Sequence, residues 1–370
     1  MGKFEDLGVR KEFVKGLKEL NIINPTEIQE KAIPLLISKA GDLVGQAQTG
    51  TGKTAAFGLQ LLHKIDTKSK KVQALILCTT RELGQQVAKQ LFKFTKYSDR
   101  IFTEAVYGGE NIEIQIGKLK RPTHIIVATP GRLLDLIRRK AVDIRQVKTI
   151  VLDEADEMLS MGFKEELEAI LTGIKSAESR WLFSATISKD INDIIYNYLS
   201  RSAHRIAIAS ENVVNQNIKH EFLACKDADK LENILAYLSS QDESRGVIFC
   251  KTKADTQKLA EQLKSKGVSA DAINGDLKQK ERDKVMRAFK NESLQVLIAT
   301  DLAARGIDIE DIAYVAHYSM PDKAEYYTHR SGRTARAGKT GTSISFVNNK
   351  ELKSLKIFQK ELGFKLNDLG

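Results

Sequence analysis

The sequence predicts an α/β protein in which mostly parallel sheets are covered by helices, and three observations lead to that class. Short apolar runs rich in β-branched residues alternate with helix-like stretches along the chain, a pattern typical of strand–helix–strand units. Polar residues directly follow most of these runs, as expected where parallel strands end at a binding edge. The chain also resembles itself, so two copies of one α/β unit are expected.

Eight apolar runs are the predicted strands, and their lengths suit strands buried on both faces of a sheet better than helices. They are Ala74–Cys78, Ile125–Ala128, Ile150–Leu152, Trp181–Phe183, Val247–Cys250, Val296–Ala299, Tyr314–Ala316 and Ser343–Val347.

The internal similarity is clearest between Ala74–Leu91 and Gly246–Leu263, where seven aligned positions carry identical residues. Nearly the same offset aligns Ala128-Thr129 with Ala299-Thr300. Duplication of one unit explains this most simply, although chance similarity between strand–helix units is an alternative.

Composition and length describe a globular protein with more than one core. The 370 residues favour two domains, and 42% hydrophobic with 29% charged residues excludes a disordered chain. The net charge of +10 favours a polyanionic partner without separating nucleic acid from a generally basic surface. No secretory or membrane-spanning segment is evident, and the three cysteines lack metal-ligand spacing; we therefore expect buried thiols, no membrane partner and a cytoplasmic location.

The segment Ala47–Thr54 (AQTGTGKT) has the form of a loop whose backbone N–H groups surround a phosphate. Its glycines allow close approach, Lys53 would reach the β- and γ-phosphates, and the Thr54 hydroxyl would ligate Mg²⁺. The strict pattern begins with Gly, whereas this chain has Ala47. An ordinary glycine-rich turn is the alternative.

The segment Thr149–Asp156 (TIVLDEAD) is an apolar strand that ends in acidic residues. Ligands of open α/β sheets bind beyond such strand ends, so Asp153 would hold the metal through water and Glu154 would position the attacking water. A solvated acidic turn is the alternative interpretation. With the loop above, the pattern indicates nucleotide hydrolysis.

The second half has no segment that repeats the glycine-rich loop Ala47–Thr54, and it carries the arginine-rich cluster His329–Gly338 (HRSGRTARAG) instead. Guanidinium groups supplied across a cleft stabilise the transition state of phosphoryl transfer, with effects of roughly 10³–10⁵ in rate. Opening the cleft would stop hydrolysis and so link chemistry to domain motion. A solvated or RNA-contacting face is the alternative.

These segments, taken in order, resemble the DEAD-box family of ATP-dependent RNA helicases, in superfamily 2, over essentially the whole chain. The resemblance implies tandem RecA-like domains at residues 1–206 and 218–370, each a mostly parallel sheet with helices on both faces, joined by a short linker at 207–217. The matching segments are Ala47–Thr54 (motif I), Thr80–Leu83 (Ia), Gly108-Gly109, Thr129–Arg132 (Ib), Asp153–Asp156 (II), Ser184–Thr186 (III), Val247–Thr252 (IV), Ala299–Asp308 (V) and His329–Gly338 (VI).

The resemblance implies ATP as the nucleotide and Mg²⁺ as the cofactor. Phe4 and Pro25–Gln29 resemble the Q motif, so Phe4 would stack on adenine and Gln29 would read its edge. A packed Phe4 and a helix-surface Gln29 are the alternatives. The implied nucleotide contacts are Phe4, Thr26, Gln29, Ala47, Gln48, Thr49, Gly50, Thr51, Gly52, Lys53, Thr54 and, at the ribose, Asp308.

Catalysis and coupling are also assigned through the resemblance. Arg333 and Arg336 match the family's arginine fingers and would act with Lys53, Asp153 and Glu154. Ser184 and Thr186 would bond Asp156 and His329 across the cleft, although hydroxyl-capped strand ends are an alternative. The implied coupling residues are Asp156, Ser184, Thr186, His329 and Arg330.

RNA is implied to cross the face opposite the nucleotide and to be held by its phosphates and 2′-OH groups, without base sequence. Most of these residues are alternatively helix caps or surface charges, and Gly275 alternatively lies in a simple turn. The implied contacts are Thr80, Arg81, Gly109, Thr129 and Arg132 from the first domain, and Thr252, Gly275, Gln279, Arg282 and Thr300 from the second.

Four residues depart from the usual family pattern without removing a charged or hydroxyl group that the mechanism needs. They are Thr79 in place of Pro, Gly84 in place of Ala, Ser331 in place of Ile and Ala335 in place of Gly.

We therefore expect an RNA-stimulated ATPase, acting as a monomer, that unwinds short duplexes locally or remodels RNA–protein complexes. A DNA-translocating motor of the same superfamily and a non-enzymatic RNA clamp are the competing interpretations. The Q motif argues against the first, and retention of Glu154, Arg333 and Arg336 argues against the second. The target RNA and protein partners are not predicted.

Overall fold

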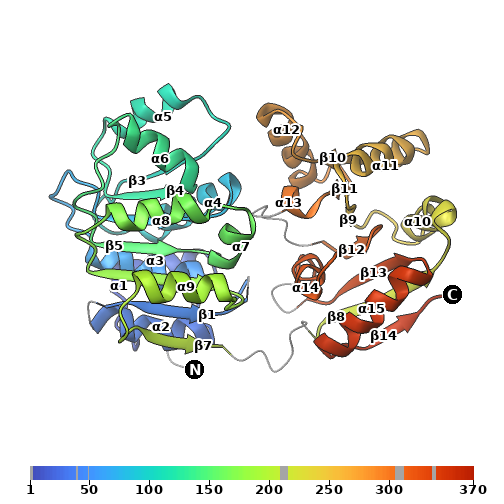
Figure 1. The fold of residues 1–370 in the computed structure, drawn as a ribbon, viewed down its shortest axis with the longest axis horizontal. Helices are drawn as coiled ribbons and strands as arrows, with labels where there is room; N and C mark the ends of the chain where they lie inside the picture. The colour runs from blue at the N-terminus through green and yellow to red at the C-terminus, as the bar shows by residue number, and fades with distance from the viewer. Residues whose placement is uncertain (1–2, 39–40, 49, 209–215, 305–311, 336–338) are drawn as a thin grey trace. The chain divides into compact units, whose positions relative to one another are not determined.

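The structure, a computed structural model, describes residues 3–38, 41–48, 50–208, 216–304, 312–335 and 339–370. The chain forms two compact units, Met1–Ala209 and Ser210–Gly370, which are drawn in Figure 1. Each unit contains one 7-stranded sheet, and all the strand pairs in both sheets are parallel. The predicted fold class is confirmed. The predicted linker, residues 207–217, spans the boundary and lies largely outside the described residues.

The first sheet has the strand order β3-β4-β2-β5-β6-β1-β7. Its strands are β1 Leu43–Gln46, β2 Ala74–Leu77, β3 Thr103–Val106, β4 Ile125–Ala128, β5 Thr149–Leu152, β6 Ser179–Ser184 and β7 His204–Ala207. The helices are α1 Lys11–Glu19, α2 Glu27–Ser38, α3 Lys53–Lys64, α4 Arg81–Phe94, α5 Ile112–Leu119, α6 Pro130–Arg138, α7 Ala155–Ser160, α8 Lys164–Gly173 and α9 Lys189–Tyr198.

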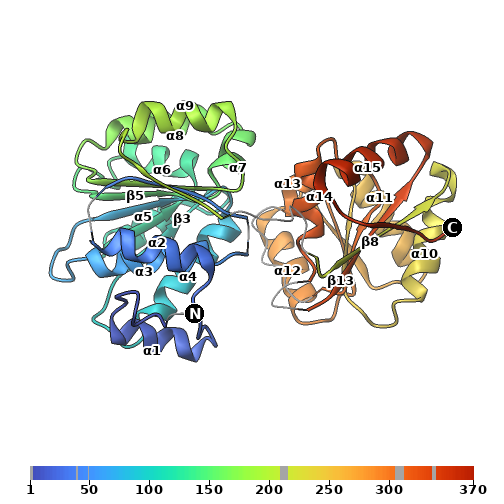
Figure 2. The same cartoon turned by 90° about the horizontal axis from the view of Figure 1, so that it is seen from below.

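Helices cover both faces of this sheet, as Figure 2 shows edge-on. Successive side chains of a strand point to opposite faces, so Ala74 and Ile76 of β2 join the core under α1–α4. Leu75 and Leu77 join the core formed with α6–α9. Burial on both faces explains why the central strands were visible in the sequence as unbroken apolar runs.

The second sheet has the order β10-β11-β9-β12-β13-β8-β14. Its strands are β8 Ile218–Ala224, β9 Gly246–Phe249, β10 Ala270–Ile273, β11 Val296–Ala299, β12 Tyr314–His317, β13 Gly341–Val347 and β14 Leu366–Asp368. The helices are α10 Lys230–Ser239, α11 Lys253–Ser265, α12 Gln279–Lys290, α13 Asp301–Ala304, α14 Ala324–Ser331 and α15 Asn349–Leu362, with a 3₁₀ turn at Asp227–Asp229.

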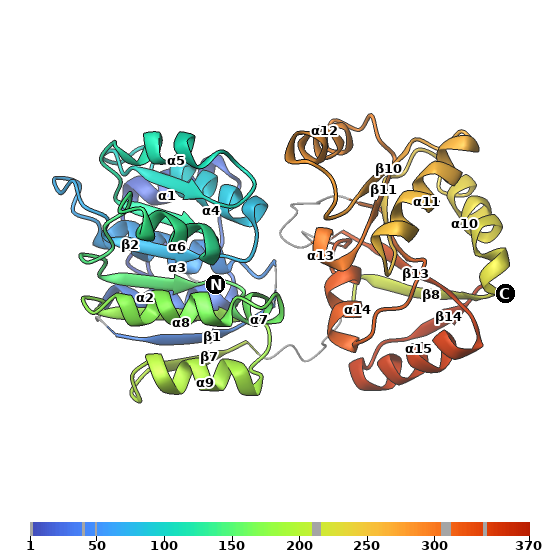
Figure 3. The same cartoon turned by 45° about the horizontal axis from the view of Figure 1, so that its top comes forward.

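The two sheets share one topology, because the second order is the first with each strand number raised by seven. The aligned segments Ala74–Leu91 and Gly246–Leu263 accordingly form β2–α4 and β9–α11. Figure 3 shows α10 and α11 on one side of the second sheet and α14 and α15 on the other. The repeat inferred from the sequence therefore corresponds to a repeated α/β unit.

Six strands escaped prediction because their sequences lack an apolar run. The edge strand β7 has three exposed residues among its four, and β3 is mostly half-buried. β1 contains Gly45, which is required by packing, since a Cβ there would lie 2.8 Å from the ring of Phe183. The others are β8, β10 and β14.

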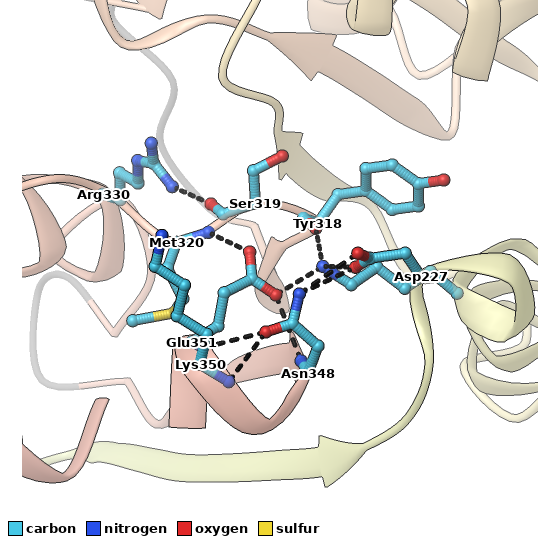
Figure 4. Close-up of polar contacts among 9 residues, drawn as sticks. Asp227, Tyr318, Ser319, Met320, Arg330, Asn348, Lys350 and Glu351 are labelled. Atoms are coloured by element: carbon cyan, nitrogen blue, oxygen red, sulfur yellow. Dashed lines mark hydrogen bonds and ion pairs between the residues drawn. The ribbon is translucent and has the colours of Figure 1, made fainter. Parts of the chain in front are cut away.

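A buried lysine makes polar contacts that join three elements of the second unit. Figure 4 labels its partners Asp227, Tyr318 and Glu351. The Lys230 ammonium, at the start of α10, contacts Glu351 Oε2 at 2.6 Å, Asp227 Oδ1 at 3.1 Å and the Tyr318 carbonyl at 3.2 Å. Glu351 also accepts hydrogen bonds from the backbone N–H groups of Asn348 and Met320. The start of α15 is thereby joined to α10 and to the loop after β12.

Replacing Lys230 with Ala should destabilise the second unit by about 2–4 kcal/mol, because Glu351 would lose its cation in a largely buried place. Urea unfolding measures this loss. Lys251→Ala is the matched control, since Lys251 pairs with Asp322 while both side chains are more than half exposed; a loss below about 1 kcal/mol is expected there. Equal effects of the two substitutions would contradict the assigned role of Lys230.

Candidate nucleotide site and nucleic-acid interface

The candidate site residues of the first unit follow the carboxyl ends of its parallel strands. The phosphate loop follows β1, the acidic residues follow β5, and Ser184 ends β6 between them. The candidate RNA residues follow β2, β3 and β4, in the other half of the same sheet. The two sets thus share the carboxyl edge of the sheet but lie in its two halves, and the path of RNA relative to the nucleotide stays a prediction.

Polar contacts within the phosphate loop fix its conformation. Lys53 is 6% exposed, and its ammonium donates a hydrogen bond to the Ala47 carbonyl at 2.9 Å. Thr51 Oγ1 donates to the Gln48 carbonyl at 2.7 Å. Gly50 and Gly52 have φ of +84° and +91°, the left-handed region that favours glycine. Lys53 and Thr54 then open α3, whose first N–H groups lack partners within the helix.

Thr26 and Gln29 brace this loop, a role that the sequence did not indicate. Gln29 Oε1 accepts from the Thr26 N–H at 2.9 Å, and Gln29 Nε2 donates to the Gly52 carbonyl at 3.0 Å. Thr26 Oγ1 donates to the Thr51 carbonyl at 2.7 Å. A Cβ at position 52 would lie 2.3 Å from Gln29 Nε2, so this glycine permits the contact. The Gln29 side chain is 3% exposed, so it is not a helix-surface amide. Recognition of adenine by Gln29 stays a prediction.

The position of Phe4 differs from the one expected for a residue that stacks on adenine. Its side chain is 1% exposed and belongs to the core beneath α1 and α2. A ring that is enclosed on both faces cannot stack on a base unless its neighbours move. The alternative interpretation, a packed residue, describes Phe4 in this structure.

Asp153 is a buried carboxyl group with an unsatisfied oxygen. Its Oδ1 has no hydrogen-bond partner among the described residues, and burial, only partly opposed by Lys53, raises its pKa to about 7. A cation would satisfy this oxygen and favour the charged form. No group of three or more His, Cys, Asp or Glu with metal-binding geometry occurs in the described parts of the chain. This arrangement fits Mg²⁺, which is commonly held by one carboxylate together with substrate phosphates.

Glu154 stands at the sharp turn between β5 and α7. Its φ of +55° and ψ of +52° are left-handed, which is unfavourable for a residue with a Cβ by about 1–2 kcal/mol. Glu154 Oε2 accepts a hydrogen bond from Thr79 Oγ1 at 3.2 Å. Strained backbone of this kind is common where a side chain is aimed at a ligand.

The Asp156 carboxylate is tied to the end of β6. Its Oδ2 accepts hydrogen bonds from the Ala185 N–H, the Thr186 N–H and Thr186 Oγ1 at 3.1, 2.8 and 3.0 Å. Ser184 Oγ accepts from the Asp156 N–H at 3.3 Å and donates to the Thr186 carbonyl at 2.7 Å. The acidic segment and the Ser-Ala-Thr segment therefore form one network, whereas the expected contact with His329 stays a prediction.

Arg330 lies in the interior of the second unit and is 2% exposed. Its Nε and Nη2 contact the two Asp301 oxygens at 2.5 and 2.7 Å, and Nη1 donates to the Ser319 carbonyl at 2.7 Å. The guanidinium also lies over the Phe249 ring. These contacts lie within its own unit and join α14 to α13. The expected coupling role of Arg330 stays a prediction.

The structure describes only part of the arginine-rich cluster His329–Gly338. Arg333 lies in the turn after α14, where its N–H donates to the Arg330 carbonyl, and its side chain is half-buried. Ala335, which replaces the family's usual Gly, has a left-handed φ of +57°. Thr49, Asp308 and Arg336 lie outside the described residues.

Among the candidate RNA residues, several threonines stand directly before helices that follow strands. Thr80 accepts from the Leu83 N–H at 3.2 Å, and Thr252 accepts from the Asp255 N–H at 3.0 Å, while Thr129 precedes α6 without a side-chain bond. Thr80 and Thr252 are therefore helix caps, the alternative given for them in the sequence. Helix N-termini at the strand ends are also favourable places for phosphate groups.

The candidate RNA arginines of the first unit are held by neighbouring side chains. Arg132 donates to Gln115 Oε1 at 2.9 Å and to the Glu110 carbonyl at 3.0 Å, next to Gly109, whose φ is +83°. The Arg81 guanidinium lies 4.7 Å from the centre of the Tyr107 ring.

In the second unit, the Asp276 N–H donates to Asn274 Oδ1. Gly275 therefore lies in a simple turn, which was the alternative to an RNA contact at this position. Gln279 donates to Asp283, Arg282 to the Ala303 carbonyl, and Thr300 accepts from the Ala303 N–H. These contacts order the surface that follows β10 and β11.

The Asp153 carboxyl group should titrate near pH 7 in the ligand-free chain, as followed by ¹³C NMR of labelled aspartate. Because the folded-state pKa is raised above its unfolded value, ionisation opposes folding, and the carboxyl's contribution to stability falls between about pH 4 and pH 7. Saturating Mg²⁺ and ATP should move the midpoint below about 5. Asp143 is the control, since Arg145 lowers its pKa to about 2 far from the loop. An Asp153 midpoint near 4 without ligand would contradict this electrostatic assignment.

Among the residues that the structure describes, no helix is long and apolar enough to cross a membrane. Cys78, Cys225 and Cys250 are free thiols. Burial raises the pKa of Cys78 and Cys250.

Comparison of the sequence with known proteins points to one family. Residues 26–194 match the family profile described as DEAD/DEAH box helicase, and residues 228–338 match the helicase conserved C-terminal domain. The chain is 41% identical over 360 residues to the DEAD-box ATP-dependent RNA helicase CshA of Bacillus cereus, covering 97% of this chain and 68% of the relative. It is 42% identical to CshA of Listeria monocytogenes, covering 97% and 69%.

Solved structures agree. The chain is similar to S. cerevisiae Dbp5 bound to RNA and ADP BeF3, with a TM-score of 0.91, 31% identity and coverage of 100% of this chain and 96% of the other. It is also similar to Mss116p bound to ssRNA and AMP-PNP, with a TM-score of 0.88, 27% identity and coverage of 99% and 78%. The chain therefore belongs to the DEAD-box ATP-dependent RNA helicases.

Proposed function

We propose that this chain hydrolyses ATP with Mg²⁺ and uses the cycle to separate short RNA duplexes locally or to remodel RNA–protein complexes. The observation that carries the proposal is the buried Asp153 oxygen without a donor, next to a lysine that closes a phosphate loop. Such a carboxyl group is costly to a protein unless a cation completes it. The relatives named above, which are ATP-dependent RNA helicases, support the same activity.

Each candidate catalytic residue of the first unit has a defined role in this proposal. Lys53 exchanges its hydrogen bond with the Ala47 carbonyl for the phosphates of ATP. Asp153, through water, and the Thr54 hydroxyl hold Mg²⁺, which supplies positive charge to the phosphate oxygens when it is bound. Glu154 orients the attacking water.

In the proposal, the chain binds the sugar–phosphate backbone of RNA and does not recognise its bases. Thr80, Thr129 and Thr252 stand at helix N-termini, where N–H groups and the helix dipole favour phosphate. Arg81 and Arg132 add positive charge on surfaces ordered by Tyr107 and Gln115. Contacts of this type position RNA without reading its sequence.

Both domains take part in the proposed cycle. They close on ATP and a single strand in a shape that a continuous A-form duplex does not fit, so base pairs are lost locally. Arg333 and Arg336 of the second domain then stabilise charge on the γ-phosphate, and the Asp156–Thr186 network reports the nucleotide state. Phosphate release reopens the domains and frees the strand. One chain is sufficient for this cycle, and we propose a monomer that acts in the cytoplasm, where its free thiols remain reduced.

Glu154→Gln should lower RNA-stimulated ATP hydrolysis at least about 100-fold, and Arg333→Ala should lower it about 10³-fold. Both variants should keep the affinity for ATP, because neither removes Lys53 or the loop. Steady-state hydrolysis and equilibrium binding of a fluorescent ATP analogue measure the two quantities. Arg201→Ala, which changes an exposed arginine of the first unit, should behave as the unmodified chain. Unchanged turnover in Glu154→Gln would refute the assigned chemistry.

Hydrolysis should be stimulated strongly by single-stranded RNA of mixed sequence and hardly at all by DNA of the same sequence. The reason is that 2′-OH groups distinguish the two strands at backbone contacts. Turnover measured against increasing concentrations of each oligonucleotide tests this. Equal stimulation by DNA would favour the competing DNA-translocating motor.

A further inference from the structure

A hydroxyl group directly faces the candidate water-orienting glutamate, and the strand register explains why. β2 and β5 are parallel neighbours with Leu77 opposite Leu152, and the Asp153 N–H donates to the Leu77 carbonyl at 2.9 Å, which continues the pairing beyond the strands. Two residues past the paired leucines, Thr79 comes opposite Glu154. Thr79 Oγ1 donates a hydrogen bond to Glu154 Oε2 at 3.2 Å.

This contact is the only hydrogen bond that the Glu154 carboxylate makes with another side chain in the described part of the structure. Thr79 is 2% exposed, so water does not readily compete for its hydroxyl group. Hydrogen bonds to charged groups in such places contribute about 1.5–3 kcal/mol. The contact is therefore strong enough to select one orientation of the carboxylate.

The chemistry of the donor suits a glutamate that must hold a water. A hydroxyl group fixes one carboxylate oxygen without cancelling the negative charge, as a lysine or arginine partner would. The other oxygen, Oε1, then remains available to accept from the attacking water. Positioning matters at Glu154 in particular, because its left-handed backbone sits on the turn between β5 and α7.

Position 79 is also where this chain departs from its family, which usually has proline there. Proline has no side-chain donor, so a relative with proline cannot make this contact. We propose that Thr79 is a positioning residue for ATP hydrolysis, which holds the Glu154 carboxylate in the orientation that presents it to the attacking water. This inference rests on the role of Glu154 given under the proposed function.

Single-turnover hydrolysis of ATP by the purified chain, with Mg²⁺ and saturating single-stranded RNA, tests the proposal. Thr79→Val keeps the shape of the side chain and removes the donor, so the rate of the hydrolysis step should fall about tenfold while the KM for ATP changes less than about twofold. Thr79→Ser keeps the donor and should restore the rate to within about threefold. Thr123→Val is the matched control, because Thr123 is also buried, at 4% exposure, and its hydroxyl donates to the Arg121 carbonyl; its rate should be unchanged.

Glu154→Gln and the double variant Thr79→Val/Glu154→Gln separate this inference from the proposed function. If Thr79 acts through Glu154, the double variant should hydrolyse ATP no more slowly than Glu154→Gln alone. Full activity of Thr79→Val beside an inactive Glu154→Gln would overturn the role of Thr79 and leave the proposed function intact. A Thr79→Val defect that appears in KM alone, or that Ser does not rescue, would also overturn it. An active Glu154→Gln would instead refute the proposed function itself.

Discussion

A carboxyl group is enclosed at the end of a strand that is buried on both faces, and the rest of the first unit is arranged around it. Asp153 directly follows β5, where the adjoining Val151 and Leu152 are fully covered. Burial disfavours its charged form, and the nearby Lys53 offsets that only in part. A charge in such a place is tolerated when partners surround it, so a metal-bound triphosphate suits this edge of the sheet. The bracing of the loop by Thr26 and Gln29, and the attachment of Asp156 to the end of β6, preserve the spacing on which that electrostatic fit depends.

The duplicated topology makes the difference between the units easy to locate. β8 and β12 take the places that β1 and β5 have in the first sheet, yet they are followed by other residues. Cys225 and Lys226 follow β8 in place of a phosphate loop, and Tyr318 and Ser319 follow β12 in place of Asp153 and Glu154. The Ser319 carbonyl accepts from Arg330, so this end of the second sheet is closed by an internal arginine. The same topology thus carries the candidate nucleotide site in one unit and anchors the arginine-rich cluster in the other.

The sequence was sufficient for features that depend on local pattern. The central strands were visible because both of their faces are apolar, and the Gly-Lys-Thr and Asp-Glu-Ala-Asp segments carry their chemistry in adjacent residues. The burial of Phe4 and Arg330 does not follow from their motifs, because a motif specifies residue type and not burial. The ion pair of Arg330 joins residues 29 positions apart in the chain, and the enclosure of Phe4 depends on helices α1 and α2. The contact between Thr79 and Glu154 depends on the register of β2 against β5, which the sequence alone does not provide.

The most direct test of the account is a crystal structure of this chain with single-stranded RNA, Mg²⁺ and a non-hydrolysable ATP analogue. The account predicts that Asp153 Oδ1 contacts a water molecule of the bound Mg²⁺ and that the Arg333 guanidinium donates to the γ-phosphate. A complex in which the metal avoids Asp153, or in which Arg333 points away from the phosphates, would contradict it.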